Sequence, residues 1–193
     1  MKILFVVLVL VLASVPALSQ GTSNITCKMP FQNIGSRCLF LDPLEAGTWY
    51  DMRLFCSMQG QGVDLVVLDD PNLLHAVYQY ITEYGLDRTH YWIGASDQDA
   101  EGVWLWVDST PVHLGAPYWR YDCDIENSNP LRPKLDSNAN CAALDHTANF
   151  YFADFPCLGD GGDSSFSPIC EDEPIYLDEY DDYEDESDEV NEE

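Results

Sequence analysis

An apolar N-terminal run followed by seven cysteines constrains the fold of this chain more than any other feature. Lys2 precedes the unbroken apolar run 3–12, and small residues at 17–19 offer a cleavage site before Gln20, which is the pattern of a secretory signal. The run is too short to span a bilayer, which needs about 20 apolar residues. We therefore expect residues 1–19 to be a signal peptide, and the mature chain to be secreted, extracellular and without a membrane anchor.

Secretion changes how the cysteines are interpreted. In an oxidising compartment, cysteines form disulfides more often than metal sites, and the sequence has no CxxC or Cys/His zinc spacing. Because seven is an odd number, one thiol lacks a partner within the chain. The spacing alone leaves the connectivity open among Cys27, Cys38, Cys56, Cys123, Cys141, Cys157 and Cys170.

Acidic residues are concentrated at the C-terminus. The formal net charge is −26, and residues 171–193 carry 14 acidic side chains and no Lys or Arg. Such a run cannot bury enough apolar surface to fold, so we expect residues 172–193 to be a disordered acidic tail. The rest of the chain is also acidic, which argues against nucleic acid and anionic membrane as partners.

About 150 residues remain between signal and tail, which suits one domain with a core of its own. We expect a leader at 20–26 and a single domain at 27–171. The leader contains the sequon Asn24-Ile25-Thr26, so we expect a glycan on Asn24.

Local patterns predict two helices and several short strands. Thr48 caps a helix over 48–59, and Asp70 with Pro71 begins a second helix that ends at Gly85. Their apolar faces are predicted to be Trp49, Met52, Phe55 and Met58 in the first and Leu74, Val77, Tyr78 and Ile81 in the second. A strand pair is expected around Gly35 at 31–41, and single strands at 63–68, 91–94, 103–107, 141–144 and 169–170. This mixture indicates an α+β fold.

Several ordered motifs resemble the C-type lectin-like domain. They are Trp92-Ile93-Gly94, the stretch 101–108 with its two alternating tryptophans, Asn140-Cys141-Ala142-Ala143-Leu144, then Cys157, and finally Ile169-Cys170-Glu171. The resemblance covers roughly residues 27–171, and the segment 113–119 is most similar to secreted arthropod members. We expect Trp92, Trp104 and Trp106 to lie in the core rather than on a sugar-stacking surface.

The resemblance implies a disulfide-stapled fold of two helices, short antiparallel strands and a long ligand loop. It implies the long form of the domain, with the pairs Cys27–Cys38, Cys56–Cys170 and Cys141–Cys157. Cys123 is then unpaired, which suits a disulfide-linked homodimer.

Many members of this family bind sugar through calcium, using a Glu-Pro-Asn or Gln-Pro-Asp triplet, a later Glu and an Asn-Asp pair. The matching positions here are Arg132-Pro133-Lys134, Ala139 and Ala153-Asp154, and neither Asn129-Pro130-Leu131 nor Glu126-Asn127-Ser128 restores the triplet. Only Asp154 is kept, and two cations repel a divalent ion that needs several oxygen ligands. We therefore expect a degenerate calcium site and no required cofactor. The loop Asp160–Asp163 could hold a weak calcium, but a turn is the alternative interpretation.

The function that the resemblance implies is pattern recognition of glycans or glycoproteins in innate immunity. Because the calcium ligands are lost, we expect the ligand either to be bound without calcium or not to be a sugar. Candidate ligand-binding residues are Arg132, Pro133, Lys134 and Asp154, whose cations would suit an anionic glycan; two solvated loop cations are the alternative. An enzyme is not expected, because no GxSxG, HExxH or P-loop pattern occurs.

A second hypothesis is a matrix or mineral-associated structural protein that acts through the acidic tail. A flexible polyanion attracts cations, basic proteins and mineral surfaces. Tyr176, Tyr180 and Tyr183 lie in acidic surroundings that are typical of tyrosine sulfation, which would add further negative charge.

Overall fold

The computed structural model describes residues 25–121, 132–134, 138–158 and 166–176. Its helical elements are α1 (Trp49–Ser57), α2 (Pro71–Glu83) and the single 3-10 turn η1 (His146–Ala148). The strands are β1 (Ile25–Thr26), β2 (Gln32–Ile34), β3 (Arg37–Leu41), β4 (Asp64–Leu65), β5 (Tyr91–Ser96), β6 (Leu105–Trp106), β7 (Cys141–Asp145), β8 (Tyr151–Phe155), β9 (Ser167–Asp172) and β10 (Ile175–Tyr176).

Side chains in the first turn of each helix fix the residue at which the helix begins. The Thr48 hydroxyl accepts from the backbone N–H of Asp51, while the Asp51 carboxylate accepts from the backbone N–H of Thr48, a reciprocal cap that satisfies two otherwise unpaired donors. The Asp70 carboxylate caps α2 by accepting from the backbone N–H of Asn72, with Pro71 at the first helical position. Both predicted helix starts are confirmed.

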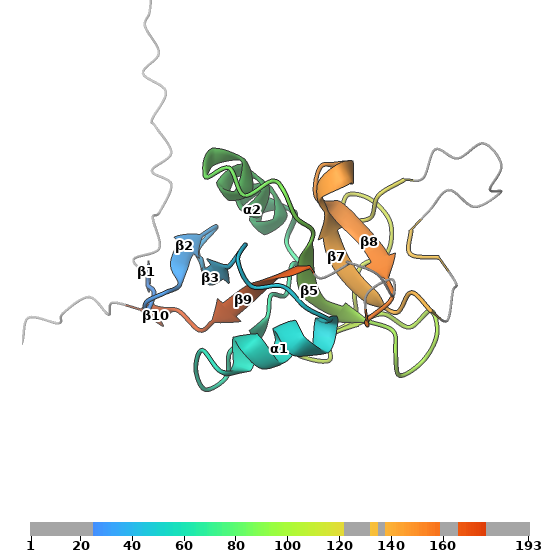
Figure 1. Cartoon of the computed structure of the whole chain (residues 1–193), viewed down its shortest axis with the longest axis horizontal. Helices are drawn as coiled ribbons and strands as arrows, with labels where there is room; N and C mark the ends of the chain where they lie inside the picture. The colour runs from blue at the N-terminus through green and yellow to red at the C-terminus, as the bar shows by residue number, and fades with distance from the viewer. Residues whose placement is uncertain (1–24, 122–131, 135–137, 159–165, 177–193) are drawn as a thin grey trace, which may run out of the picture.

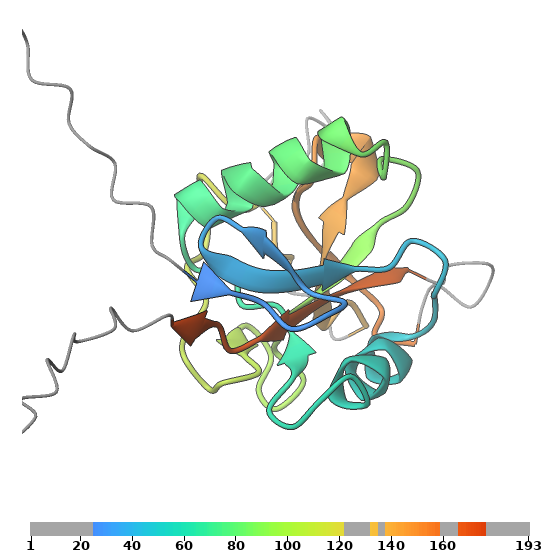
Figure 2. The ribbon, with the colours of Figure 1, turned by 90° about the vertical axis from the view of Figure 1, so that its left-hand side faces the viewer.

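The main sheet is mixed and runs in the order β2-β3-β9-β5-β7-β8, with β4 paired to β9 and β6 paired to β5. Strands β5 and β9 run parallel, and the other pairs are antiparallel. The two helices lie on opposite sides of the central strands, α2 above and α1 below in both views (Figures 1 and 2). This arrangement confirms the α+β fold class.

Each helix packs against its own part of the core. From α1, Trp49, Met52 and Cys56 join one cluster; from α2, Leu73, Val77 and Ile81 join the other. Two residues differ from the predicted apolar faces. Met58, which directly follows α1, is 69% exposed, and Tyr78 of α2 is 38% exposed. The buried positions are instead Cys56, fixed by its disulfide, and Leu73, one residue before the predicted Leu74. The three strand tryptophans, Trp92, Trp104 and Trp106, are buried as expected.

Three disulfides staple this fold. They join Cys27 to Cys38, Cys56 to Cys170, and Cys141 to Cys157, which are the pairs that the family resemblance implied. The second pair joins residues 114 positions apart and ties α1 to β9. Closing so long a loop stabilises the fold by about 4–5 kcal/mol on the chain-entropy account.

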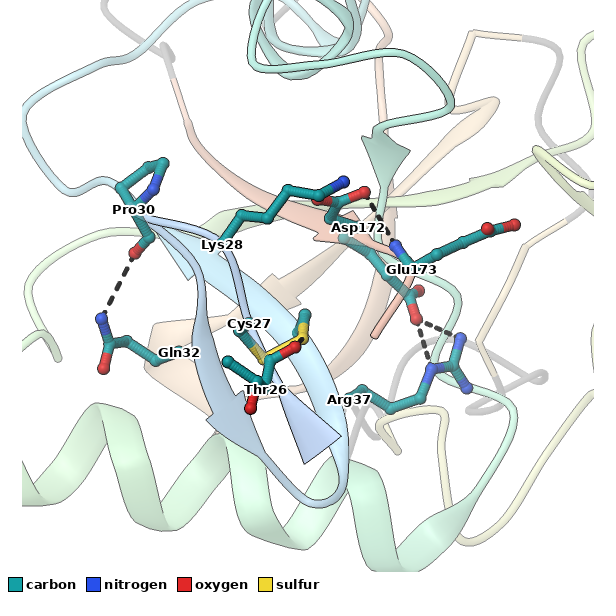
Figure 3. The surroundings of a disulfide bond; sticks show 10 residues. Thr26, Cys27, Lys28, Pro30, Gln32, Arg37, Asp172 and Glu173 are labelled. Atoms are coloured by element: carbon teal, nitrogen blue, oxygen red, sulfur yellow. Dashed lines mark hydrogen bonds and ion pairs between the residues drawn. A yellow bond between two sulfur atoms is a disulfide. The ribbon is translucent and has the colours of Figure 1, made fainter. Parts of the chain in front are cut away.

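The two chain ends of the described domain are fastened together. Strand β1 pairs with β10 through Ile25 opposite Tyr176 and Thr26 opposite Ile175. Figure 3 shows the Cys27–Cys38 disulfide beside this pair, with the Lys28 ammonium directed at the Asp172 carboxylate, 3.6 Å away. Ordered pairing therefore extends past the predicted domain limits, into the leader at residue 25 and into the predicted tail as far as Tyr176.

Strand lengths and number are the other departures from expectation. The segments 63–68 and 103–107 contain only the two-residue strands β4 and β6. Strand β8 was not predicted at all, although it pairs with β7 along its full length. The turn before Tyr151–Phe155 is made by Asn149 and Phe150, which have positive φ angles. Because this turn contains no Gly or Pro, the sequence has no turn signal before the strand.

Candidate functional site

The one retained calcium-ligand position, Asp154, forms a buried ion pair with an arginine. The carboxylate lies on β8 opposite Ala142 of β7, and its side chain is 0% exposed. Arg132 Nη1 donates to Asp154 Oδ1 over 2.7 Å, and the backbone N–H of Lys134 donates to Asp154 Oδ2 over 3.2 Å. The guanidinium also lies 3.4 Å from the backbone oxygen of Asp154.

This geometry provides Asp154 with its counter-charge from inside the chain. The Arg132 side chain is 16% exposed, so the pair is shielded from water and its attraction is stronger than that of a surface pair. A cation that approached Asp154 would have to displace the guanidinium. The neighbouring positions, Ala139 and buried Ala153, offer no side-chain oxygen to compensate.

The placement of Arg132 differs from both sequence-based interpretations of it. It is neither a solvated loop cation nor an open charge for an anionic ligand, because it points at Asp154 and is mostly buried. Lys134 and Pro133 are half-buried beside it. The structure thus joins Arg132 and the backbone of Lys134 to Asp154 in an internal contact; that these residues bind a ligand stays a prediction.

A second buried carboxylate, Asp97, lies close to this pair and was not predicted. It is 2% exposed, and its Oδ2 accepts from the backbone N–H of Gly102 over 2.8 Å. Its Oδ1 has no hydrogen-bond partner within the described residues. Burial raises the pKa of Asp97, the Gly102 N–H partly offsets this, and the charge of Asp154 raises it further.

A third buried carboxylate lies at the opposite end of β7. Asp145 is 1% exposed and forms an ion pair with Arg120 through Oδ2. Its Oδ1 accepts from the Thr147 backbone N–H over 2.9 Å and from the Thr147 hydroxyl over 2.6 Å. Burial alone would raise the pKa of Asp145, but Thr147, Arg120 and His90 together lower it.

Two imidazoles complete this second cluster. His90 Nδ1 lies 3.3 Å from Asp145 Oδ1, and the rings of His90 and His146 meet edge to face with centroids 4.2 Å apart. Burial lowers the pKa of His90; His146 and Arg120 lower it further, while Asp145 opposes them. This cluster was not predicted, since 55 positions separate His90 from Asp145. The signal that could have found it is the Asp145-His146 pair at the end of a buried strand.

A hollow of about 440 Å³ lies between the start of α2 and the turn that leads into β8. Two partly exposed tyrosines, Tyr78 and Tyr151, lie on its wall with polar groups from His75 and Asn149. Tyrosine faces next to amide and imidazole groups can stack on a ring and hydrogen-bond to its substituents. This hollow is separate from the Arg132–Asp154 pair in sequence and in lining residues.

Several predicted site residues fall outside the described part of the chain. They are Cys123, the sequon residue Asn24, the Asp160–Asp163 loop, Tyr180 and Tyr183. Tyr176 is described and is 68% exposed. Among the described residues, no helix has the length and apolar character needed to cross a membrane.

A mixed sheet, two flanking helices and three disulfides define a disulfide-bonded α+β domain of the C-type lectin class. Residues 45–171 match the family described as the lectin C-type domain. The chain belongs to this family, whose members are generally binding proteins rather than enzymes.

Relatives of this chain come from distant animals. The chain is 25% identical to human C-type lectin domain family 4 member D over 141 residues, covering 72% of this chain and 58% of the relative. It is 26% identical to a perlucin-like protein of the mussel Mytilus galloprovincialis over 147 residues, covering 76% and 85%. The matched region spans little more than half the length of the human relatives. The expected likeness to arthropod members stays a prediction.

Solved structures with the same fold include a calcium-independent protein and a carbohydrate-recognition domain. A calcium-independent type II antifreeze protein superposes with a TM-score of 0.59 at 21% identity, covering 78% of this chain and 97% of the other. The carbohydrate-recognition domain of mouse scavenger receptor C-type lectin superposes with a TM-score of 0.52 at 24% identity, covering 76% and 96%. At these identities the likeness supports the fold.

Proposed function

We propose that this protein is a secreted recognition protein. It binds its ligand without a calcium ion in the family's usual calcium site. The observation that supports this most strongly is the buried Arg132–Asp154 pair, in which a guanidinium neutralises the retained carboxylate. Calcium needs six to eight oxygen ligands, and Arg132, Lys134, Ala139 and Ala153 supply none of the family's side-chain oxygens.

Glycans or glycoproteins are the ligand class that the family favours, in a role in innate defence. The hollow beside α2 offers Tyr78 and Tyr151 for stacking, and neither tyrosine depends on a metal. We place recognition there rather than on an open cationic patch, because the guanidinium of Arg132 is directed inward.

A glycan array of the mature protein, run in parallel with calcium and with EDTA, tests this function. We expect binding that EDTA leaves unchanged and that Tyr78→Ala or Tyr151→Ala weakens at least about fivefold, the loss expected when a stacked aromatic ring is removed. Tyr50→Ala is the matched control, because Tyr50 is a partly exposed tyrosine on the other helix. Binding to neutral sugars that EDTA abolishes would overturn the proposal.

A structural role of the acidic tail is the second candidate function. The observation that favours this role is the run of acidic residues that follows β10. Strand β10 pairs with β1, which begins directly after Asn24. We propose that the tail adsorbs to cationic or mineral surfaces, with an N-glycan on Asn24 and sulfation of Tyr176, Tyr180 and Tyr183 adding to its solvation. Cys123 is the candidate for an interchain disulfide.

The structure sharpens where the tail should be cut. Asp172 pairs with Lys28 and Tyr176 pairs with Ile25, so deletion should begin at residue 177 to leave the domain intact. Removal of 177–193 is expected to abolish mineral adsorption and to leave glycan binding unchanged. Retained adsorption would assign that role to the domain instead.

A further inference from the structure

The cluster of His90, Asp145 and His146 lies away from the family's calcium position. Asp145 is the last residue of β7 and pairs with Tyr151, whereas Asp154 pairs with Ala142 near the start of β7. His90 directly precedes β5, and His146 opens the short turn η1, drawn as the orange helical turn next to β7 in Figure 1. Two neighbouring strands therefore bring two imidazoles and one carboxylate to the same end of the sheet.

We propose that His90, Asp145 and His146 form a binding site for a divalent transition metal ion of zinc's class. Each residue offers one ligand atom, and the three atoms lie within 4.8 Å of one another. With zinc–ligand bonds near 2.0–2.1 Å, tetrahedral ligand atoms lie about 3.3 Å apart. The separation of His90 Nδ1 and Asp145 Oδ1 is already 3.3 Å, which is the spacing that two ligands of one zinc ion require.

The ligand atoms are available for a metal. His90 Nδ1 and His146 Nδ1 are both buried and have no hydrogen-bond partner within the described residues. His90 Nδ1 has only Asp145 Oδ1 close by, at 3.3 Å, without hydrogen-bond geometry. Buried imidazole nitrogens without a hydrogen bond are unfavourable, and a shared metal ion would satisfy both. His146 is only half-buried, so part of its side chain faces solvent, and water would supply the fourth ligand.

The neighbouring residues would hold the carboxylate in position for the ion. The backbone N–H and hydroxyl of Thr147 hydrogen-bond to Asp145 Oδ1, the kind of outer contact that fixes the direction of a metal-bound carboxylate. His90 is held by aromatic contacts to Phe155 and Phe166, with ring centroids 5.2 Å and 4.5 Å away. Two of the three protein ligands, Asp145 and His90, are thus held in position.

The chemistry of the donors selects the metal. Imidazole nitrogen suits zinc, copper and nickel, whereas calcium and magnesium take oxygen ligands. Arg120, paired with Asp145 Oδ2, opposes any added positive charge. The site is therefore expected to be weaker than a structural zinc site and to exclude calcium.

Zinc titration by calorimetry, with the visible absorption of cobalt as a second readout, tests the proposal on the mature full-length chain. We expect one saturable site in the wild type, a tetrahedral cobalt spectrum without thiolate bands, and no competition from calcium. His146→Gln is expected to weaken zinc binding at least about tenfold, as loss of a ligand or its partner does. His113→Gln removes an exposed histidine elsewhere and is expected to leave zinc binding unchanged.

Folding is checked by circular dichroism, and His90→Phe is the second variant because it keeps the aromatic contacts. Loss of zinc binding in folded His146→Gln or His90→Phe supports the site. The proposal is overturned if the wild type shows no saturable zinc binding, or if both ligand variants bind zinc as the wild type does. Cobalt spectra with thiolate bands would also overturn it, because they would assign the metal to Cys123.

Discussion

Asp145 and Asp154 lie toward opposite ends of the β7–β8 pair, and both are buried and paired with an arginine, yet their surroundings differ. Asp154 has Arg132 and one further donor, the backbone N–H of Lys134, among the described residues. Asp145 has Arg120, two donors from Thr147 and two imidazoles close by. Arg132 is the main partner of Asp154, so a metal ion would have to displace it. Arg120 is one of several partners of Asp145, so this carboxylate can still bind a metal ion.

The largest expected effect is at Asp154. Arg132→Ala leaves a fully buried carboxylate with a single backbone donor among the residues that the structure describes, so we expect the free energy of unfolding to fall by about 3–5 kcal/mol. Urea unfolding measures it. The double variant Arg132→Met with Asp154→Leu removes both charges and should recover most of the loss; a single-variant loss close to zero would show that water already solvates this pair.

Arg120→Ala is expected to cost less, about 1–2 kcal/mol, because Thr147 continues to donate two hydrogen bonds to Asp145. The same urea experiment gives the value. The substitution also removes the charge that opposes a metal, so zinc affinity should rise about tenfold. A loss as large as that of Arg132→Ala would mean that the two carboxylates depend equally on their arginines.

The pH dependence of stability separates the two ends further, because only the Asp145 end contains histidines. The folded state lowers the pKa of His90 below its usual 6.5, so the unfolded chain takes up the proton first as pH falls. The free energy of unfolding is therefore expected to fall as the pH is lowered from about 7 to about 5, and to recover when the pH is returned to about 7.

Urea unfolding in the presence of a chelator measures this drop, which should be shallower in His90→Phe. His113→Gln, which removes an exposed histidine, should keep the wild-type drop. An unchanged drop in His90→Phe would remove His90 as its source.

The smallest expected effect concerns a carboxylate whose partner is exposed. Asp172 is 8% exposed at its side chain, but Lys28 is 62% exposed, so water screens the pair. Lys28→Ala should change the unfolding free energy by less than about 1 kcal/mol. A loss comparable to that of Arg120→Ala would show that the partner's exposure matters less than the carboxylate's burial.

Local sequence patterns sufficed for the parts of the fold that depend on neighbours in the chain. Thr48 and Asp70 marked the helix starts because capping acts within three residues. The side of each helix that faces the core was less well predicted, since the Cys56 disulfide and the position of the sheet decide it rather than periodicity; Met58 and Tyr78 are exposed as a result.

The candidate site was predictable only in its residues, not in its contacts. The resemblance located Arg132 and Asp154 at matching positions, but 22 residues separate them, and no sequence rule states that one side chain turns inward to the other. The same limit hid His90 and Asp145, which meet only because β5 pairs with β7.

The most direct test of the central claim is the melting temperature of the mature protein in millimolar calcium and in EDTA. A ligand that binds only the folded domain raises its stability, whereas calcium that binds the acidic segment 177–193 equally before and after unfolding does not. We predict equal melting temperatures for the wild type, and a calcium-dependent rise for the triple variant Arg132→Glu, Lys134→Asn, Ala139→Glu, which restores family oxygen ligands. A rise of several degrees in the wild type would contradict the account, because it would show that calcium binds despite the Arg132–Asp154 pair.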